Sequence, residues 1–144
     1  MEKTRRKWWF EKMDVESGKK RLGKDSLARY LGIELTDMEP GYAQAVMEVK
    51  PELLNGVNIT HGGAIFSLVD VVIAAASNAH GPVALALNVS IHFIKATKEG
   101  VILTATARED NLTRKTGIYR VEVRDEHNSL IALAEGLVYR PSVD

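Results

Sequence analysis

Residues 55–70 read NGVNITHGGAIFSLVD, and this stretch decides how the rest of the chain must fold. Two glycines stand where an apolar run begins, and the run predicts a helix from residue 63 to about residue 78. Asp70 is the one formal charge between residues 62 and 94. A helix without a polar stripe should be buried on nearly every side, and carboxylates are rarely buried without a partner. Asp70 is therefore the first candidate for a chemical role.

The overall composition is that of an ordinary globular protein. The chain has 144 residues, of which 45% are apolar and 26% charged, enough for one domain with a proper core. It contains no cysteine, so disulfides, thiolate metal sites and cysteine nucleophiles are excluded. The apolar runs are shorter than the roughly 20 residues that cross a membrane, and no signal peptide is recognisable. We expect a cytoplasmic protein that does not bind membranes.

Charge is unevenly distributed along a chain whose formal net charge is zero. Residues 1–24 contain nine Lys or Arg and four Asp or Glu, so the remainder of the chain is net acidic. We interpret residues 1–24 as a basic helical arm and residues 25–144 as the folded domain. A basic segment can contact nucleic acid, but a solvated terminal segment is the simpler explanation, and we expect no nucleic-acid partner.

Most of the chain outside the central helix alternates between apolar and polar residues, as strands do. A short helix is expected at 26–31, with Asp25 as its N-cap. The predicted strands cover residues 33–38, 42–50, 84–93, 101–108, 116–124 and 129–139. This order of elements is typical of an α+β fold. About six strands should form a largely antiparallel sheet, and one face of the sheet should pack on the central helix.

The start of the central helix offers backbone N–H groups that can polarise a ligand carbonyl. Backbone N–H groups in the first turn lack intrahelical partners, and at Gly63 a ligand carbonyl can approach the backbone closely. Asp70 lies roughly 10 Å further along the axis, whereas donor and attacking group must both lie about 3 Å from the reacting centre. If both serve one carbonyl, they come from different subunits of a two-fold dimer. The alternative is a structural Asp70, hydrogen bonded to Ser67, Ser77 or Asn78.

A longer pattern adds a family resemblance. Residues 54–70 fit Leu-Asn-Gly-x-x-x-x-His-Gly-Gly-x-x-Phe-x-Leu-x-Asp, which resembles the signature of hotdog-fold acyl-CoA thioesterases. The similarity extends over residues 25–139 and is closest to the phenylacetic-acid-degradation branch, the hydroxyphenylacetyl-CoA thioesterase type. The resemblance implies a hotdog fold, in which a curved antiparallel sheet wraps one long helix. It also implies hydrolysis of acyl- or aryl-CoA thioesters by a homodimer, with a homotetramer as the expected assembly.

The resemblance also implies roles for four residues of the opening segment. The Gly63 N–H would polarise the thioester carbonyl, and Asp70 of the other subunit would act as nucleophile or as general base on water. Asn55 would hold the loop, the water or the thioester region, and His61 would orient the loop or line the thioester. For both Asn55 and His61, simple loop capping is an equally good interpretation.

Further residues are expected to bind the substrate. The acyl pocket should be lined by apolar helix residues and the polar face of the strand at 84–93, while exposed cations should meet the phosphates of coenzyme A. The expected substrate-binding residues are Gly62, Asn88, Ser90, Lys95, Arg114 and Lys115. The chain departs from the family pattern at Lys24, where an amide is common, and at Lys95-Ala96, where Arg-Pro is common.

Other classes of function have less support. The four histidines are scattered and form no metal-binding spacing, and neither a P-loop nor a Rossmann fingerprint is present, so we expect no metal and no cofactor. Two alternatives remain. One is a non-catalytic acyl-CoA sensor, which would gain nothing from the charge of Asp70. The other is a hotdog hydratase or dehydratase that uses His61.

Overall fold

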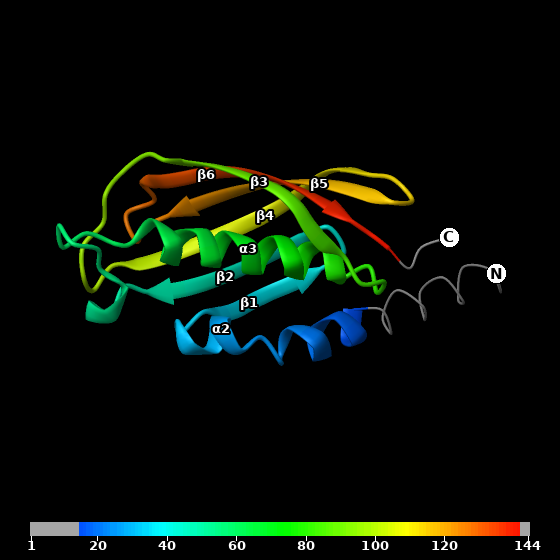
Figure 1. Ribbon diagram of the computed structural model, residues 1–144, viewed down its shortest axis with the longest axis horizontal. Helices are drawn as coiled ribbons and strands as arrows, with labels where there is room; N and C mark the ends of the chain where they lie inside the picture. The colour runs from blue at the N-terminus through cyan, green and yellow to red at the C-terminus, as the bar shows by residue number, and fades with distance from the viewer. Residues whose placement is uncertain (1–14, 142–144) are drawn as a thin grey trace.

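The computed structural model describes residues 15–141, and in it one sheet curves around one long helix (Figure 1). A helix at residues 15–22 comes first. It is followed by α2 (Ser26–Tyr30), β1 (Glu34–Glu39), β2 (Tyr42–Glu48), the 3-10 turn η1 (Pro51–Leu53), α3 (Gly62–Asn78), β3 (Leu85–Phe93), β4 (Ile102–Leu112), β5 (Thr116–Arg124) and β6 (Leu130–Tyr139).

All six strands pair antiparallel in the order β1-β2-β4-β5-β6-β3, so β1 and β3 form the two edges of the sheet. Because β3 follows α3 in the chain but pairs with β6, the helix crosses one face of the sheet between the two edges. The predicted α+β architecture, with a long helix against a six-stranded antiparallel sheet, is therefore confirmed. Among the described residues, no helix is both long and apolar enough to span a bilayer.

Small side chains let the sheet approach α3 closely. Every second residue of the strands faces the helix, and many of these residues are alanines with no measurable or little exposure: Ala43, Ala45, Ala105, Ala107, Ala132 and Ala134. Larger residues such as Met47, Leu103 and Tyr119 fill the space beyond them. The distance between packed elements depends on the side chains at the contact, so this alanine layer sets how tightly the sheet wraps.

Helix α3 is not buried on nearly every side, and that part of the sequence prediction is wrong. Gly63, Phe66 and Asp70 are exposed, and they recur at the three- and four-residue spacing of one helix face. The reason is that the sheet covers a single side of α3. In the described part of the chain, no strand or helix covers the face that carries Asp70. This apolar face with one carboxylate is available to another molecule.

The far end of α3 is tied to the N-terminal segment by a buried amide. Asn78 donates from Nδ2 to the Ala84 carbonyl at 3.1 Å and accepts the Ala84 N–H at 3.2 Å. Its Oδ1 also accepts from Arg21 at 3.1 Å. The backbone of Gly18 approaches so closely that an added Cβ would lie 2.5 Å from the Asn78 carbonyl oxygen. The second part of the predicted arm therefore packs on the domain, whereas residues 1–14 lie outside the described residues.

Removing the Asn78 amide should destabilise the protein. Asn78→Ala leaves the buried N–H and carbonyl of Ala84 without their partners, and we expect the free energy of unfolding to fall by about 2–3 kcal/mol. Chemical denaturation measures this change. Asn111→Ala, at an exposed position of β4, is the matched control and should change stability by less than about 0.5 kcal/mol. Equal effects of the two substitutions would contradict the role assigned to Asn78.

Candidate active site

The loop before α3 is built by Asn55. Its side-chain oxygen accepts the N–H groups of Val57 at 3.0 Å and Ile59 at 3.3 Å, and its own N–H donates to the Ile59 carbonyl at 2.8 Å. Asn58, at φ 61°, makes the left-handed turn that asparagine tolerates better than most residues. Asn55 thus caps the loop, which is one of the two roles expected for it, and the loop in turn fixes where α3 begins.

His61 caps the start of α3 with its side chain. Its Nδ1 accepts the Gly63 N–H at 2.8 Å, so a neutral ring carries its proton on Nε2. The absence of a side chain at Gly63 permits this contact, since an added Cβ would lie 3.0 Å from Nδ1. The amide expected to polarise a substrate carbonyl is therefore already hydrogen bonded within the chain. A ligand oxygen can take that N–H only by replacing the imidazole.

Gly62, one residue earlier, differs from Gly63. Its N–H donates no hydrogen bond to any residue in the range 15–141. A Cβ added at this position would come within 3.2 Å of the Phe93 ring at the end of β3. At the helix start, the two glycines therefore lie between the His61 imidazole and the Phe93 ring. The Gly63 N–H is already hydrogen bonded to His61, whereas the Gly62 N–H has no acceptor within residues 15–141.

Asp70 has no hydrogen bond or ion pair within residues 15–141. The groups considered as its structural partners bond elsewhere, because Ser67 donates to the Gly63 carbonyl at 2.8 Å and Ser77 to the Ile73 carbonyl at 2.7 Å. Partial removal of water by the surrounding protein raises the pKa of Asp70, and the negative charge of Asp25 raises this pKa further. Asp70 is thus an unpartnered carboxylate with an increased affinity for protons.

The cations expected to bind phosphates do not all lie near the helix start. Lys95 follows β3 at the same end of the sheet, where Thr60 bonds to Thr97. Arg114 and Lys115 lie in the β4–β5 turn, which Figure 1 shows at the end where α3 finishes. One chain therefore brings together Asn55, His61, Gly62 and Gly63, has Lys95 two residues after the Phe93 ring that meets Gly62, and keeps the Arg114–Lys115 turn away from them.

The expected acyl pocket between α3 and the polar face of β3 does not form within one chain. Ser90 pairs with Glu135 and Asn88 with Leu137, and these β3 residues lie on the face of the sheet opposite α3. The sheet itself separates them from the helix. Within one chain the apolar residues of β3, not the polar ones, face α3, so a substrate-binding role of Asn88 and Ser90 needs a second chain and stays a prediction.

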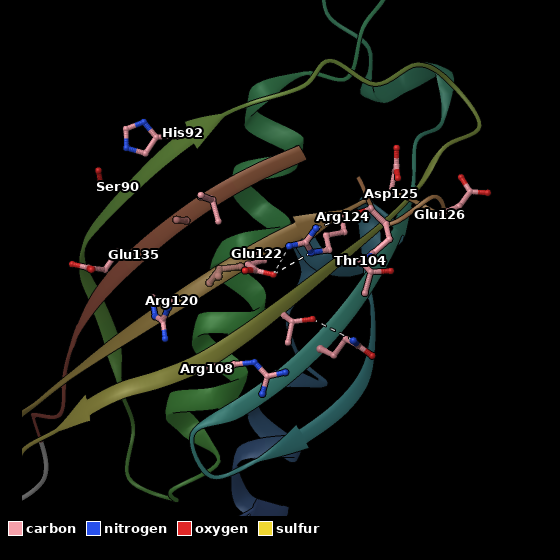
Figure 2. Close-up of a pocket in the computed structure, with 16 residues that line it drawn as sticks. Ser90, His92, Thr104, Arg108, Arg120, Glu122, Arg124, Asp125, Glu126 and Glu135 are labelled. Atoms are coloured by element: carbon pink, nitrogen blue, oxygen red, sulfur yellow. Dashed lines mark hydrogen bonds and ion pairs between the residues drawn. The ribbon is translucent and has the colours of Figure 1, made fainter. Parts of the chain in front are cut away.

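Ser90 instead lines a large open cavity of about 960 Å³ on the outer face of the sheet (Figure 2). Arginines and carboxylates of β4 and β5 surround it, and several are paired: Arg120 with Asp110 at 2.7 Å, and Arg124 with Glu122 at 3.1 Å. This cavity was not predicted from the sequence, because residues from five different strands line it. It lies on the wrong side of the sheet to serve Gly63 and Asp70 of the same chain.

A second polar cluster lies at the C-terminal end of α3. Glu109 accepts from the Tyr119 hydroxyl at 2.6 Å and lies 2.8 Å from His80 Nε2. Burial and this hydrogen bond raise the pKa of Tyr119, so the phenol remains a donor. The cluster joins the helix end to two strands. No group of three His, Cys, Asp or Glu that could hold a metal ion occurs among the described residues.

The profile of the thioesterase superfamily matches residues 57–132, more than half of the chain. The chain belongs to this superfamily. The matched region starts in the Asn55 loop and includes all of α3, so the glycines and Asp70 both lie within it. The family that the sequence pattern predicted is thereby confirmed.

Individual thioesterase relatives agree with this assignment. A protein of Archaeoglobus fulgidus, provisionally named an esterase, is 50% identical over 120 residues, which cover 83% of this chain and 78% of that protein. Acyl-coenzyme A thioesterase PaaI of Escherichia coli is 36% identical over 116 residues, covering 81% and 83%. The structure of PaaI from the E. coli phenylacetic acid degradation operon superposes with a TM-score of 0.84 at 32% identity, over 91% and 93% of the two chains.

A third relative has been solved with a ligand. A Streptococcus mutans protein bound to acetyl CoA has a TM-score of 0.72 and 28% identity, and the match covers 74% of this chain and 86% of that one.

The raised pKa of Asp70 predicts that this residue reduces stability. A carboxyl group whose pKa is higher in the folded than in the unfolded state destabilises the fold fully above the folded pKa, and the effect disappears as pH falls below the ordinary value. Asp70→Asn should therefore raise the melting temperature at pH 7 and leave it little changed near pH 3. Thermal unfolding across this range measures the difference. A variant that is less stable than the parent at pH 7 would contradict the pKa shift.

Proposed function

We propose that this thioesterase hydrolyses acyl- or aryl-CoA thioesters to the free acid and coenzyme A, at sites shared between two copies of the chain. The observation that carries the proposal is Asp70, a carboxylate that has no partner within residues 15–141 and lies on the open face of α3, in line with the glycines that begin the same helix. The acyl-CoA thioesterase activity of the PaaI relative supports the substrate class. The acetyl CoA bound by the Streptococcus mutans protein supports it as well.

In the proposed reaction the thioester oxygen displaces His61 Nδ1 and accepts the Gly63 N–H. The donor then stabilises the negative charge that develops on this oxygen as the carbonyl carbon is attacked. Asp70 either takes a proton from the attacking water or attacks the carbon itself and forms an anhydride that water then opens. In both routes the C–S bond breaks, and the coenzyme A thiolate leaves and is protonated.

The distance between the two groups requires a second chain. Asp70 lies two turns after Gly63, roughly 10 Å along the axis of the same helix, which is too far for both to reach one carbonyl carbon. A two-fold dimer that places two α3 helices side by side would bring the Gly63 of one copy to the Asp70 of the other. The dimer would also cover the exposed face of α3, where Phe66 precedes Asp70 by one turn.

The edge strand β3 is the surface on which we place this dimer contact. It is nine residues long, and Leu85, Leu87 and Phe93 on it are each more than half exposed. A long apolar edge strand with unpaired backbone groups is prone to pair with another strand. Two copies of β3 related by a two-fold axis would extend the sheet across both chains.

The phosphates of coenzyme A would then lie against cations of another copy. Arg114 and Lys115 are distant from the helix start of their own chain (Figure 1), so a neighbouring chain has to supply them. We propose a homotetramer of two dimers as the complete assembly, because the family resemblance implies it. Lys95, beside the helix start, is the phosphate-binding candidate that the same chain provides.

Loss of the Asp70 carboxylate should abolish turnover but not binding. We expect Asp70→Asn and Asp70→Ala to lower kcat for thiol release from a panel of aryl-, short- and medium-chain acyl-CoAs by about 10²- to 10⁴-fold. Calorimetric titration with coenzyme A should give an affinity close to that of the parent protein. Asp110→Asn, which removes a carboxylate on the outer face of the sheet, is the control. Unchanged kcat in the Asp70 variants would remove Asp70 from the mechanism.

A charge on the β3 edge should separate the subunits. Leu87 is 62% exposed, and Leu87→Lys would place an ammonium group in the proposed strand pairing. We expect sedimentation to show monomers and thiol release to fall in parallel, because each site needs two chains. Tyr30→Lys, at another exposed apolar position (82%), is the matched control and should preserve both the assembly and the activity. An active monomer would disprove the shared site.

A further inference from the structure

A groove of about 340 Å³ lies beside the exposed face of α3, where this helix meets β1 and the N-terminal helices. Figure 1 shows α3 in front of the sheet, with β3 passing on one side of it and the N-terminal helices on the other side, next to β1. Apolar side chains form most of the groove wall: Leu22, Ala28, Ile33, Leu35 and Val71. No residue that lines the groove has a role in the proposed reaction.

Val71 connects the groove to the exposed face that carries Asp70. Ser67 stands one turn before this pair of residues and Ala74 one turn after it. At 3.6 residues per turn, all four lie on one side of the helix. Ser67, Val71 and Ala74 are half-buried, and the Ser67 hydroxyl turns back to donate to the Gly63 carbonyl at 2.8 Å. A strip of small, uncharged side chains therefore leads from Asp70 to the groove.

The opposite side of Asp70 is the side that we assign to the second chain. Phe66 is exposed there, and Gly62 at the helix start lies against the Phe93 ring of the edge strand β3. A partner that pairs along β3 brings its own Gly63 to the carbonyl oxygen from that side. The acyl group of the same thioester is then left with the N-terminal side of α3, where the groove lies.

The size and the walls of the groove suit a compact apolar group. Its volume lies at the lower end of the roughly 300–1,000 Å³ of small-molecule sites. An aryl ring or a medium straight chain can be covered in such a space, whereas a long chain has to extend beyond it. Leu35 on the wall is 37% exposed, and contact with an apolar ligand would remove this side chain from water.

Three charged residues also line the groove and limit its apolar part. Asp25 Oδ1 accepts the Ala28 N–H at 2.9 Å, and Arg29 donates to the Gly23 carbonyl at 2.7 Å. Lys19 and Arg29 are exposed, so their charges stay hydrated. Because an unpaired charge is costly to bury, an apolar ligand group has to lie against the wall formed by β1 and α3 rather than against these residues.

We propose that this groove binds the acyl group of the thioester, and that Leu35 and Val71 determine which acyl groups are accepted. The favoured substrates are aryl- and medium-chain acyl-CoAs, and long-chain acyl-CoAs are poor substrates. Binding of a thioester at this place rests on the proposed function. Binding of an apolar group beside Asp70 does not, because it can be measured without hydrolysis.

Narrowing the groove with Leu35→Trp is the first test. We expect kcat/KM for octanoyl-CoA and benzoyl-CoA to fall at least about tenfold, because the indole occupies the space of the acyl group, and kcat/KM for acetyl-CoA to change less than about twofold. Leu133→Trp is the matched control, since Leu133 is also a strand leucine with 37% exposure but lines the cavity on the outer face of the sheet. It should keep the parent profile. An unchanged profile in folded Leu35→Trp overturns the proposal.

Widening the groove with Val71→Ala is the second test, and it decides the matter if Leu35→Trp does not fold. Removal of two methyl groups from the half-buried Val71 lengthens the apolar space next to Asp70. The ratio of kcat/KM for dodecanoyl-CoA to kcat/KM for octanoyl-CoA should rise severalfold. The same ratio in Val71→Ala and in the parent protein would contradict the proposal.

A ligand that cannot be hydrolysed separates this proposal from the proposed function. S-octyl-CoA is a thioether without the carbonyl, and calorimetric titration should give a Kd at least about tenfold lower than that of coenzyme A. Leu35→Trp should abolish this difference and leave the Kd of coenzyme A unchanged. That result in a protein that releases no thiol from any acyl-CoA would uphold the groove and reject the proposed function.

Two further outcomes would reject the groove. Thiol release with the parent chain-length profile in Leu35→Trp would retain the function without an acyl site at this place. A changed sedimentation coefficient in Leu35→Trp, together with an unchanged chain-length profile, would show that another chain and not the acyl group occupies the groove.

Discussion

Close packing between α3 and the alanines of the sheet is the contact on which the rest of the structure depends. Ala43, Ala45, Ala105 and Ala107 lie fully buried on β2 and β4, and such small side chains allow the strands to curve tightly around one side of the helix. Most apolar residues of α3 therefore lie on the side of the helix that packs against the sheet. Its other side is left with Phe66, Asp70 and the two glycines, which are the residues that a site between chains needs.

Much of this fold could be predicted from the sequence, because the alternation of apolar residues in the strands is regular. The expected helix at 63–78 differs from α3 by one residue, and all six strands were expected in the correct order along the chain. Strand β4 runs four residues further than expected, since a bulge between Glu109 and Asn111 lets pairing continue through polar residues. The position of β3 beside β6 is a tertiary feature that no local pattern encodes.

The candidate site was only partly predictable, for two physical reasons. First, the exposure of Asp70 depends on what covers α3, and an apolar surface looks the same in a sequence whether its own chain or another covers it. Second, contacts across long separations leave no local signal. Thr60 and Thr97, which bond to each other beside the helix start, are far apart in the chain, and the motif contains His61 and Gly63 but does not show that the imidazole accepts the glycine N–H.

The unequal edges of the sheet have a consequence for assembly. Strand β3 offers an apolar edge, whereas β1 carries Glu34, Asp37 and Glu39 and has a register irregularity after Leu35. Charges and bulges on an edge discourage pairing with further strands. A strand of another chain can thus add to the sheet at β3 but is discouraged at β1, so strand addition stops once two copies have paired. The architecture permits a closed pair while guarding against open-ended polymers of the amyloid kind.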